Sequence, residues 1–366
     1  MSFIVASPVW HTGHVAYGFS QKGQATWITR SRNGKRFTDL SANFQGLGPM
    51  LDYAYAVAGR LTRDELLTIA NRMFATRARS CIEKLHDIEA AWVTSSVGFG
   101  FVPWLRQRVG QLVIEERSVH PEWESAALRQ EAERWGVHYE PPLWHQAWHE
   151  EYREADLIIV PSKFVASTMV QRGVPENRLR IIPYGMETSA SAEPRQVRTG
   201  RYHVLFVGRV GLQKGVAYLL EAWRLAELPD AELIIVGAMD AGFQRVFGAL
   251  RSPNVRFLGP QPHASVLQAM RQADVTVLPS VFDAYPLVLL ESLSVGTPVI
   301  TTSTVGSTEY IKQGVTVVPP KSSERLAQAL QQLNRIRGAG IDRPVRAATW
   351  SDYRDAVQGL NVISRA

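Results

Sequence analysis

The second half of this 366-residue chain alternates short apolar runs with longer amphipathic segments, and this alternation restricts the folds open to it. Short uninterrupted apolar runs are typical of parallel strands that are buried on both faces, whereas the amphipathic segments show helical spacing. We therefore predict a doubly wound α/β domain from residue 201 onward. Its strands are expected over residues 202–207, 232–236, 255–258, 275–278, 299–302 and 315–318, and its helices over 215–225, 243–250, 264–271, 287–295, 307–312 and 323–337.

The first half shows the same alternation less cleanly. Strands are expected over residues 3–6, 25–29, 53–57, 91–94, 112–115 and 157–160, and helices over 63–85, 122–135 and 162–172. A chain of 366 residues exceeds what one hydrophobic core usually supports, so two domains are expected. A stretch of small, polar and turn residues lies between the halves. We predict an N-terminal domain over 1–184, a linker over 185–200, a C-terminal domain over 201–345 and a C-terminal segment over 346–366.

Composition and cysteine content limit the class of protein. The hydrophobic share of 45% and the charged share of 20% are those of a globular protein, which excludes disorder as the main state. The single cysteine, Cys81, cannot form an internal disulfide and fits a reducing compartment. The N-terminus lacks a basic signal region, and no apolar run has the length of a membrane span. We therefore expect a cytoplasmic protein.

The net charge of +6 originates in the first 110 residues, which contain 13 Lys and Arg but only 7 Asp and Glu. A basic N-terminal face could attract an anionic membrane surface or a lipid phosphate. Dispersed charge of this size is also what an ordinary solvated surface carries. Two interpretations of this charge therefore stay open: peripheral contact with the inner face of a membrane, or an ordinary solvated surface. No nucleic-acid partner is expected.

A segment rich in glycine and cations, GRVGLQKG, follows the strand predicted at 202–207. Gly208 lets the backbone approach a ligand, Arg209 supplies a fork of donors, and Lys214 places a point charge at the next helix start. Together they could hold a diphosphate, although surface cations near a helix start would give the same pattern. The spacing GxxxxGK[ST] is absent, and no GxGxxG follows the first strand. A nucleoside triphosphatase and a nicotinamide enzyme both lose support.

Two carboxylates follow the strand predicted at 275–278. Asp283 lies on a loop, and Glu291 lies one turn inside the helix that begins near Pro286. A helix start offers free N–H groups and a positive dipole end to an anionic ligand. The Glu291 carboxylate can accept hydrogen bonds from two neighbouring hydroxyls, as a ribose presents them. Combined with Arg209 and Lys214 at another strand end, the pattern indicates a sugar-nucleotide pocket in a cleft between domains.

The segments that carry these residues resemble those of a known family. FVGRVGLQKG and PSVFDAYPLVLLESLSVGTPVI closely resemble segments of retaining glycosyltransferases with the GT-B fold, specifically glycosyltransferase family 4 (glycosyl transferases group 1). EADLIIVPSKFVASTMVQRGVPENRLRIIPYGME and VRFLGPQPHASVLQAMRQADVTVLPS extend the resemblance over nearly the whole chain. It implies two Rossmann-like doubly wound domains that face each other across a cleft. It also implies that a helix near 350–361 packs back on the N-terminal, acceptor-binding domain.

The resemblance also implies roles for single residues. Arg209 and Lys214 would hold the donor diphosphate, and Glu291 the ribose hydroxyls. Asp283 stands where the family usually has Glu and would contact hydroxyls of the donor sugar, with a shorter reach. Gly208 and the loop residues around Pro286 would complete the donor site through the backbone; these loop residues are Ala284, Tyr285 and Leu287.

Two N-terminal positions enter the expected site by resemblance alone. VWHTGHVAYGF resembles the family's glycine loop, which would place Gly13, and with it His14, beside the phosphates or the acceptor. His120 is similar in placement to the family's active-site histidine near the donor sugar. A lone histidine after a strand is more often structural, so both interpretations of His120 stay open.

Other polar and aromatic residues receive simpler interpretations. Glu309 could cap a helix or face the site, and capping is preferred. His145 and His149 are four residues apart, but a third ligand with matching spacing is missing, so no metal is expected there. Four tryptophans are attributed to core packing rather than to sugar stacking: Trp123, Trp135, Trp144 and Trp148.

The expected reaction moves a hexose from a UDP- or GDP-linked sugar to a hydroxyl of a glycan, lipid-linked or small-molecule acceptor in polysaccharide or glycoconjugate biosynthesis. The resemblance implies retention of the anomeric configuration by front-face attack, which sequence does not distinguish from double displacement. No Asp-x-Asp triplet occurs, so neither a metal nor a cofactor is expected. Arg209, Lys214 and the helix start would neutralise the leaving group. A nucleotide-sugar epimerase of the same fold and a catalytically silent sugar-nucleotide-binding protein are the alternatives.

Overall fold

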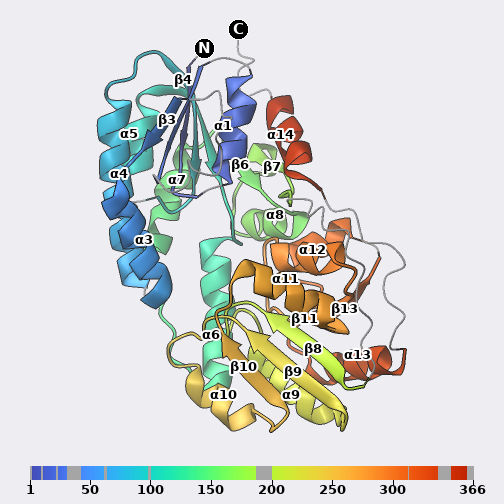
Figure 1. The fold of residues 1–366 in the computed structure, drawn as a ribbon. Coiled ribbons are helices and arrows are strands. Elements are labelled where there is room, and N and C mark those ends of the chain that lie inside the picture. The colour runs from blue at the N-terminus through green and yellow to red at the C-terminus, as the bar shows by residue number, and fades with distance from the viewer. Residues whose placement is uncertain are drawn as a thin grey trace.

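The computed structural model describes residues 2–9, 11–21, 24–30, 43–61, 64–97, 100–186, 200–311, 313–336 and 348–360. They form two α/β halves, each built on its own sheet (Figure 1). The N-terminal sheet has the strand order β3-β2-β1-β4-β5-β6-β7, and the C-terminal sheet has the order β10-β9-β8-β11-β12-β13. All neighbouring strands run parallel, which agrees with the predicted architecture.

The N-terminal half uses short apolar strands buried on both faces, as in β1, where four of five residues are buried. Its strands are β1 (Ser2–Ala6), β2 (Gln24–Thr29), β3 (Asn43–Gly46), β4 (Ile88–Thr94), β5 (Val109–Glu115), β6 (Leu157–Val160) and β7 (Leu179–Ile181). Its helices are α1 (Thr12–Ser20), α3 (Pro49–Leu61), α4 (Asp64–Ile82), α5 (Phe101–Arg106), α6 (Pro121–Trp135), α7 (Trp148–Glu154) and α8 (Lys163–Val170), with 3-10 turns η1 (Leu143–Ala147) and η2 (Glu176–Arg178).

The C-terminal half follows the predicted alternation closely. Its strands are β8 (Tyr202–Val207), β9 (Ala231–Val236), β10 (Val255–Gly259), β11 (Val275–Leu278), β12 (Val299–Thr302) and β13 (Val315–Val318). Its helices are α9 (Val216–Ala226), α10 (Gln244–Leu250), α11 (His263–Gln272), α12 (Leu287–Ser294) and α13 (Ser323–Arg335). The helix predicted at 307–312 is the 3-10 turn η3 (Gly306–Tyr310).

The strand predicted at 53–57 is wrong, because these residues lie inside helix α3, which packs against α4. The alternation of tyrosine and alanine imitates the two-residue period of a strand. Leu51 is fully buried, whereas Tyr53 is 72% exposed, as expected on opposite faces of a helix. The alanine, leucine and methionine content of the segment also favours a helix.

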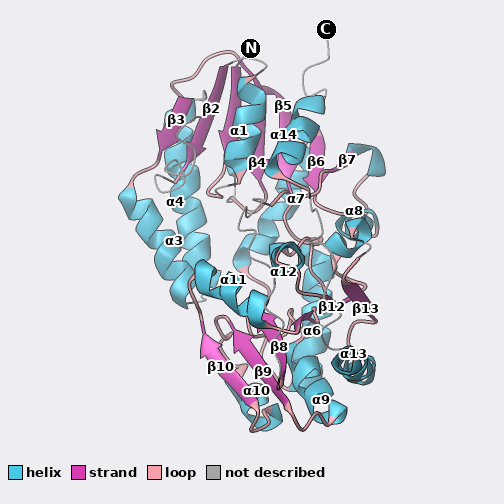
Figure 2. Cartoon of the chain, turned by 45° about the vertical axis from the view of Figure 1, so that its right-hand side comes forward, coloured by secondary structure: helices cyan, strands magenta, loops and turns pink. Residues whose placement is uncertain are grey.

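The C-terminal helix α14 (Trp350–Gly359) lies beside α1 of the N-terminal half (Figures 1 and 2). Trp350, Tyr353 and Val357 belong to the same buried apolar cluster as the β1 residues Phe3 and Val5. The chain therefore returns to its first half at its end. Residues 346–347 and 361–366 of the expected C-terminal segment lie outside the described residues, as do residues 187–199 of the expected linker.

The chain passes between the two halves twice, and the two connecting segments contact each other. Met186 precedes the C-terminal half and forms a parallel bridge with Thr349, which precedes α14. The Met186 N–H donates to the carbonyl of Ala348 at 2.9 Å. A Cβ at Gly185 would lie 2.3 Å from the Thr349 backbone, so only glycine permits this approach.

Helix α6 reaches from the N-terminal half onto the C-terminal half (Figures 1 and 2). Near its end, the buried Glu131 accepts a hydrogen bond at 2.8 Å from the Tyr218 hydroxyl of α9. Its other oxygen lies 2.8 Å from Nζ of Lys321, which precedes α13. The rings of Trp135 and Tyr218 meet edge to face at 5.3 Å. One buried carboxylate thus joins α6 to two elements of the C-terminal half.

Candidate functional site

Two loops of the C-terminal half leave the same edge of its sheet. They follow β8 and β11, which are parallel neighbours with Val204 opposite Val275. The Val281 N–H donates to the carbonyl of Gln213 at 2.9 Å and holds the two loops together. Gly215 has φ +64°, and a Cβ there would lie 2.0 Å from the Pro279 oxygen. This contact between the loops therefore requires glycine at position 215.

The predicted cation and carboxylate of these loops meet directly. The Lys214 ammonium donates to Oδ2 of Asp283 in a short charge-assisted contact. Both side chains are largely shielded from solvent. The Asp283 backbone is fixed as well, because its N–H donates to Thr304 and its carbonyl accepts from Gly306. Two groups predicted from segments 69 residues apart thus lie side by side.

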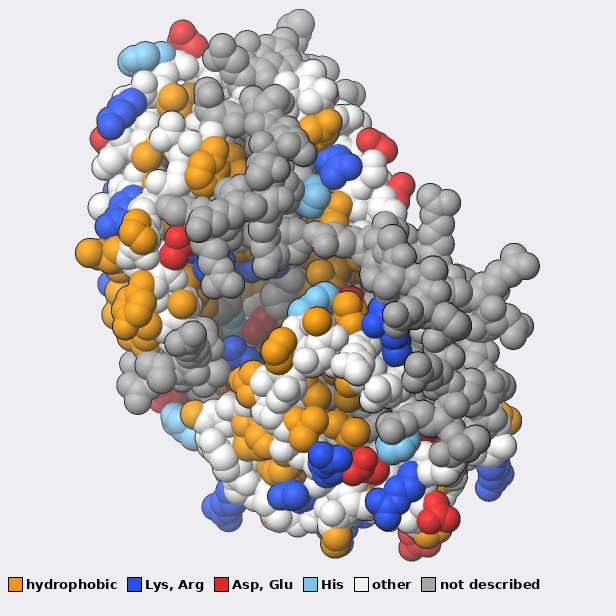
Figure 3. All heavy atoms as spheres, in the orientation of Figure 1, with side chains coloured by type: hydrophobic (Ala, Val, Ile, Leu, Met, Phe, Trp, Pro, Cys, Tyr) orange, Lys and Arg blue, Asp and Glu red, His pale blue; other side chains and the backbone are white. Residues whose placement is uncertain are grey.

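Arg209 occupies the next position along the same edge. Its Nη1 lies 3.3 Å from Oδ1 of Asp240, which follows the neighbouring strand β9. Arg209, Gln213 and Asp240 line a pocket of about 440 Å³ whose other wall includes Leu128 of α6 and Tyr139. Figure 3 shows the molecule hollowed between its two halves, with charged side chains around the hollow. The pocket therefore joins both halves at the strand ends.

Glu291 lies in the second turn of α12, on the face that meets the start of α11. Its Oε1 is 2.9 Å from Nε2 of His263, the first residue of α11. The Glu291 side chain is 20% exposed and that of His263 is 67% exposed, so both can reach a ligand. The three loop residues expected to offer N–H groups, Ala284, Tyr285 and Leu287, surround the start of this helix.

The loop that precedes α12 is anchored to the N-terminal half. The Ser162 hydroxyl, at the N-cap of α8, donates to the carbonyl of Ala284 at 3.1 Å. Tyr285 is buried and packs edge to face on Tyr184 at 5.9 Å. Phe282 packs on Trp123 of α6 at 5.4 Å. The loop that carries Asp283 is therefore held from both sides of the cleft.

The expected N-terminal glycine loop is the first turn of α1, which begins at Thr12. Gly13 is buried in that turn, after the carboxyl end of β1. His14 faces α14: its Nδ1 lies 3.1 Å from Nη1 of Arg354, and its ring stacks on Trp350 at 4.7 Å. Burial, with the Arg354 charge second, lowers the pKa of His14 to about 3. His14 thus packs between helices of the N-terminal half.

His120 is the N-cap residue of α6 and is fully buried. Its Nδ1 accepts a hydrogen bond at 3.2 Å from the Glu122 N–H, and its ring packs on Trp148 at 4.4 Å. Burial first, and nearby Arg172 second, lower the pKa of His120 to about 4, so the ring is neutral at neutral pH. These contacts of its ring come from the N-terminal half, and the structure shows His120 as a helix cap.

Glu309 caps a helix, as preferred from the sequence. Its two carboxylate oxygens accept from the N–H groups of Lys163 and Phe164 at 2.9 and 2.7 Å, at the start of α8. The helix belongs to the opposite half, so this cap is also a contact between halves. Core packing is confirmed for three tryptophans, Trp123, Trp135 and Trp148.

The described residues offer neither a metal-ion site nor a membrane-spanning helix. Among them, no group of three or more His, Cys, Asp and Glu could hold a metal ion. His145 contacts the Ser125 hydroxyl at 3.2 Å. No helix in the same ranges is both long and apolar enough to cross a membrane.

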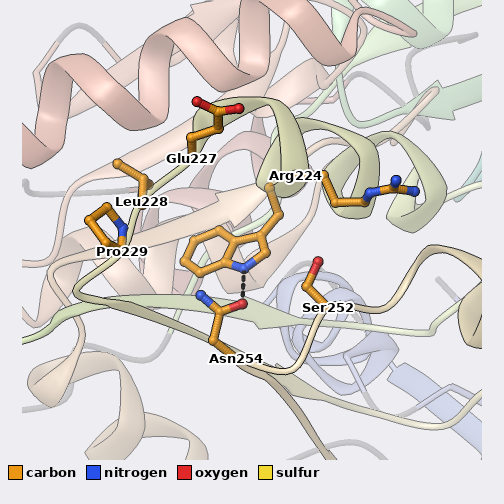
Figure 4. Close-up of a pocket in the computed structure, with 7 residues that line it drawn as sticks. Arg224, Glu227, Leu228, Pro229, Ser252 and Asn254 are labelled. Carbon is orange, nitrogen blue, oxygen red and sulfur yellow. Dashed lines mark hydrogen bonds between the residues drawn. The ribbon is translucent and has the colours of Figure 1, made fainter.

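A second pocket, of about 500 Å³, lies elsewhere on the C-terminal half (Figure 4). Trp223 donates to Oδ1 of Asn254 at 2.9 Å along its floor. Pro229 and Asn254 precede β9 and β10, so this pocket lies at the amino ends of the strands. None of the predicted site residues lines it, and ligands of such folds bind at the opposite edge.

Sequence reasoning missed two residues of the site, Asp240 and His263. Asp240 follows β9 just as Arg209 follows β8, so the rule that strand ends share an edge could have found it. The contact of His263 with Glu291 joins residues 28 positions apart on two helices, and no local signal reveals it.

Comparisons with known proteins show which sequences and folds the chain is similar to. Residues 189–339 match the family model described as glycosyl transferases group 1. Over 98% of the chain, the structure is similar to sucrose-phosphate synthase (tll1590) from Thermosynechococcus elongatus, with a TM-score of 0.64, 20% identity and 95% of that chain covered. The predicted GT-B fold is thereby confirmed, and the chain resembles the GT-B glycosyltransferases.

Particular relatives refine this picture. The chain is 28% identical to D-inositol 3-phosphate glycosyltransferase of Mycobacterium tuberculosis over an alignment of 285 residues. This alignment covers 69% of this chain and 59% of that protein. The chain thus spans 59% of the length of the curated relatives it matches. The structure of Anabaena Alr3699/HepE in complex with UDP-glucose has a TM-score of 0.62 and 14% identity, covering 98% of this chain and 94% of that one.

Proposed function

We propose that this protein transfers a hexose from a UDP- or GDP-linked sugar to a hydroxyl of a glycan, lipid-linked or small-molecule acceptor, with retention of the anomeric configuration. The contact of Lys214 with Asp283 at the carboxyl edge of the C-terminal sheet carries this proposal. It places a phosphate-binding cation beside a carboxylate suited to sugar hydroxyls. The complex of Anabaena HepE with UDP-glucose supports a nucleotide sugar as donor.

Each donor group has a proposed partner. Arg209 and Lys214 hold the diphosphate, and the Gly208 backbone lets it approach. Lys214 has three N–H donors, so it can keep Asp283 and bind a phosphate oxygen at once. Asp283 orients hydroxyls of the sugar, and Glu291 accepts from the ribose hydroxyls.

The leaving group gains negative charge as the bond to the sugar breaks. We propose that Arg209, Lys214 and the N–H groups at the start of α12 neutralise this charge, which requires no metal or cofactor. The N–H groups are those of Ala284, Tyr285 and Leu287. Attack on the front face of the sugar then retains its configuration without a glycosylated protein carboxylate.

The N-terminal half completes the proposed site. Gly13 lies in the first turn of α1 and faces the phosphates from that side. His120 acts near the donor sugar as a neutral imidazole, in addition to its observed role as a cap. A lipid-linked acceptor would bring the basic N-terminal half to an anionic membrane surface, a contact that vesicle sedimentation at low and high salt would test.

Calorimetry with UDP, GDP and ADP and their sugars tests donor binding. We expect one nucleotide to bind best and Lys214→Met to weaken it 10- to 100-fold, because a charge-assisted hydrogen bond contributes about 1.5–3 kcal/mol. The matched control is Lys163→Met, an exposed lysine on α8. If no sugar nucleotide binds, or if both variants bind equally, the proposal is wrong.

Turnover separates the proposal from its alternatives. An epimerase converts the donor without an acceptor, and a silent binding protein shows no turnover. We expect transfer only when an acceptor is present. NMR of the product should show the anomeric configuration of the donor, and an inverted product would refute retention.

A further inference from the structure

The carboxylate proposed to bind the donor ribose is paired with an exposed histidine. His263 is the first residue of α11, and its Nε2 lies 2.9 Å from Oε1 of Glu291 on α12. A carboxylate only accepts hydrogen bonds, so the His263 Nε2–H is the donor in this contact. Because a carboxylate has about four acceptor positions, the Glu291 side chain can keep His263 and still accept from hydroxyls of a ligand.

The two helices that carry this pair are fixed by their core contacts. α11 and α12 pack side by side (Figures 1 and 2). Val288 of α12 packs against a buried apolar cluster that includes Val266 and Met270 of α11. The hydroxyl of Thr297, which follows α12, donates to the Met270 carbonyl at 2.7 Å. Packing therefore determines where the helices lie, and the exposed pair determines only the direction of the Glu291 side chain.

The pair contributes more to ligand binding than to folding. The His263 side chain is 67% exposed, and water screens pairs of this kind, so they add little to stability. An unrestrained glutamate side chain samples several rotamers and loses this freedom when a ligand immobilises it. A side chain that is already held in the binding orientation avoids that loss.

Other groups proposed for the donor are held by partners in the same way. Arg209 follows β8 and lies 3.3 Å from Asp240, which follows the neighbouring strand β9. His263 comes after β10, the strand on the other side of β9. Side chains beyond the ends of β9 and β10 thus restrain one proposed phosphate ligand and the proposed ribose ligand.

We infer that His263 is a positioning residue for the donor, which holds the Glu291 carboxylate in the orientation that accepts from the two ribose hydroxyls. The inference rests on the proposed function, because it deepens the role of Glu291 in the same site. A nucleotide that lacks these hydroxyls gains nothing from the orientation of the carboxylate. The pair therefore favours ribonucleotide donors over deoxyribonucleotide donors.

The test measures the binding of matched nucleotides by calorimetry. The probes are UDP and GDP, each with its 2′,3′-dideoxy counterpart. We expect His263→Ala to weaken binding of the preferred ribonucleotide by about 3- to 10-fold, the cost of immobilising one flexible side chain. Binding of its dideoxy counterpart should not change. A merely structural role of His263 would weaken both ligands by the same factor, and that result would overturn the inference.

Further variants separate the pair from its surroundings. His263→Gln keeps an amide donor near the position of Nε2 and should recover part of the loss. The matched control is His86→Ala, the same change at an exposed histidine before β4, which should bind as the wild type. In the Glu291→Gln background, His263→Ala should have little further effect, because the carboxylate that it orients is gone. An undiminished effect in that background would overturn the inference.

The same measurements distinguish the inference from the proposed function. Thermal melting of His263→Ala should match that of the wild type, so a change in affinity reports on the site. If ribonucleotides bind but His263→Ala and His86→Ala bind them equally, the inference is wrong and the proposed function stands. If no form of the protein binds UDP, GDP or their sugars, the proposed function is wrong and the inference falls with it.

Discussion

The buried carboxylate of Glu131 provides a sharp test of how the two halves are joined. Glu131 is 2% exposed and accepts from Tyr218 at 2.8 Å, from Trp135 at 3.3 Å and from Lys321 at 2.8 Å. Glu131→Gln keeps the shape and one acceptor oxygen but removes the charge. Hydrogen bonds to a charged group contribute about 1.5–3 kcal/mol, against about 0.5–1.5 for neutral pairs.

The magnitude follows from the contacts with Tyr218 and Lys321, because the Trp135 contact is the longest of the three and should change least. The Tyr218 bond should lose about 1 kcal/mol when its acceptor becomes neutral. The pair with Lys321 should lose up to about 1 kcal/mol, since Lys321 is 35% exposed and water screens it. We therefore expect Glu131→Gln to lower the free energy of unfolding by about 2 kcal/mol, or the melting temperature by roughly 4–8 °C.

Calorimetric melting against a matched control measures this effect. Glu133→Gln removes the same charge two residues further along α6, where the side chain is exposed, and should cost less than about 0.5 kcal/mol. A double-mutant cycle with Lys321→Met isolates the ion pair. If Glu131→Gln and Glu133→Gln melt at the same temperature, the carboxylate does not join the halves and this reasoning is refuted.

Three further predictions concern capping and pH. His120→Ala should lower stability by about 1 kcal/mol in urea unfolding, whereas His120→Asn keeps the cap; if His120→Asn also keeps the transfer rate, its proposed role near the sugar is wrong. Glu309→Gln should cost about 1 kcal/mol in the same assay by removing charge from the start of α8, and an unchanged midpoint would contradict the cap. Burial raises the pKa of Glu151 from 4.5 to about 8, so the folded state keeps a proton that the unfolded state releases. The stability that this proton provides is full below pH 4.5 and is lost as the pH rises to 8. Glu151→Gln should therefore flatten the decline in the urea midpoint between pH 5 and 8. An unchanged slope would contradict the raised pKa of Glu151.

The C-terminal fold was predictable because its strands are uniform in character. The strands at 202–207, 275–278, 299–302 and 315–318 have the predicted bounds. The first three are largely buried and read as short apolar runs, and β13 keeps such a run although it lies at the sheet edge with Val317 exposed. The N-terminal sheet was harder. Its strand β3, NFQG, lacks an apolar run, and β7 is three residues long, so neither gives a periodic signal.

The site was predictable only as far as local sequence reaches. Glycine, cations and acids after β8 and β11 indicated the strand ends, and the parallel sheet brings Lys214 to Asp283. The partners of Arg209 and Glu291, namely Asp240 and His263, depend on how neighbouring loops and helices pack. Such contacts between distant segments leave no periodic pattern in the sequence. The same holds for the Glu131 carboxylate of α6, which accepts from Tyr218 of α9.

The bridge between Met186 and Thr349 has a consequence for movement of the halves. The described ends of the two segments that lead from one half to the other are bonded at the same place, so the described part of the connection is a two-stranded strap rather than a single tether. Such a strap bends across its width but resists torsion. Any opening of the molecule should then follow one hinge direction, and the halves should swing toward each other without turning about the strap.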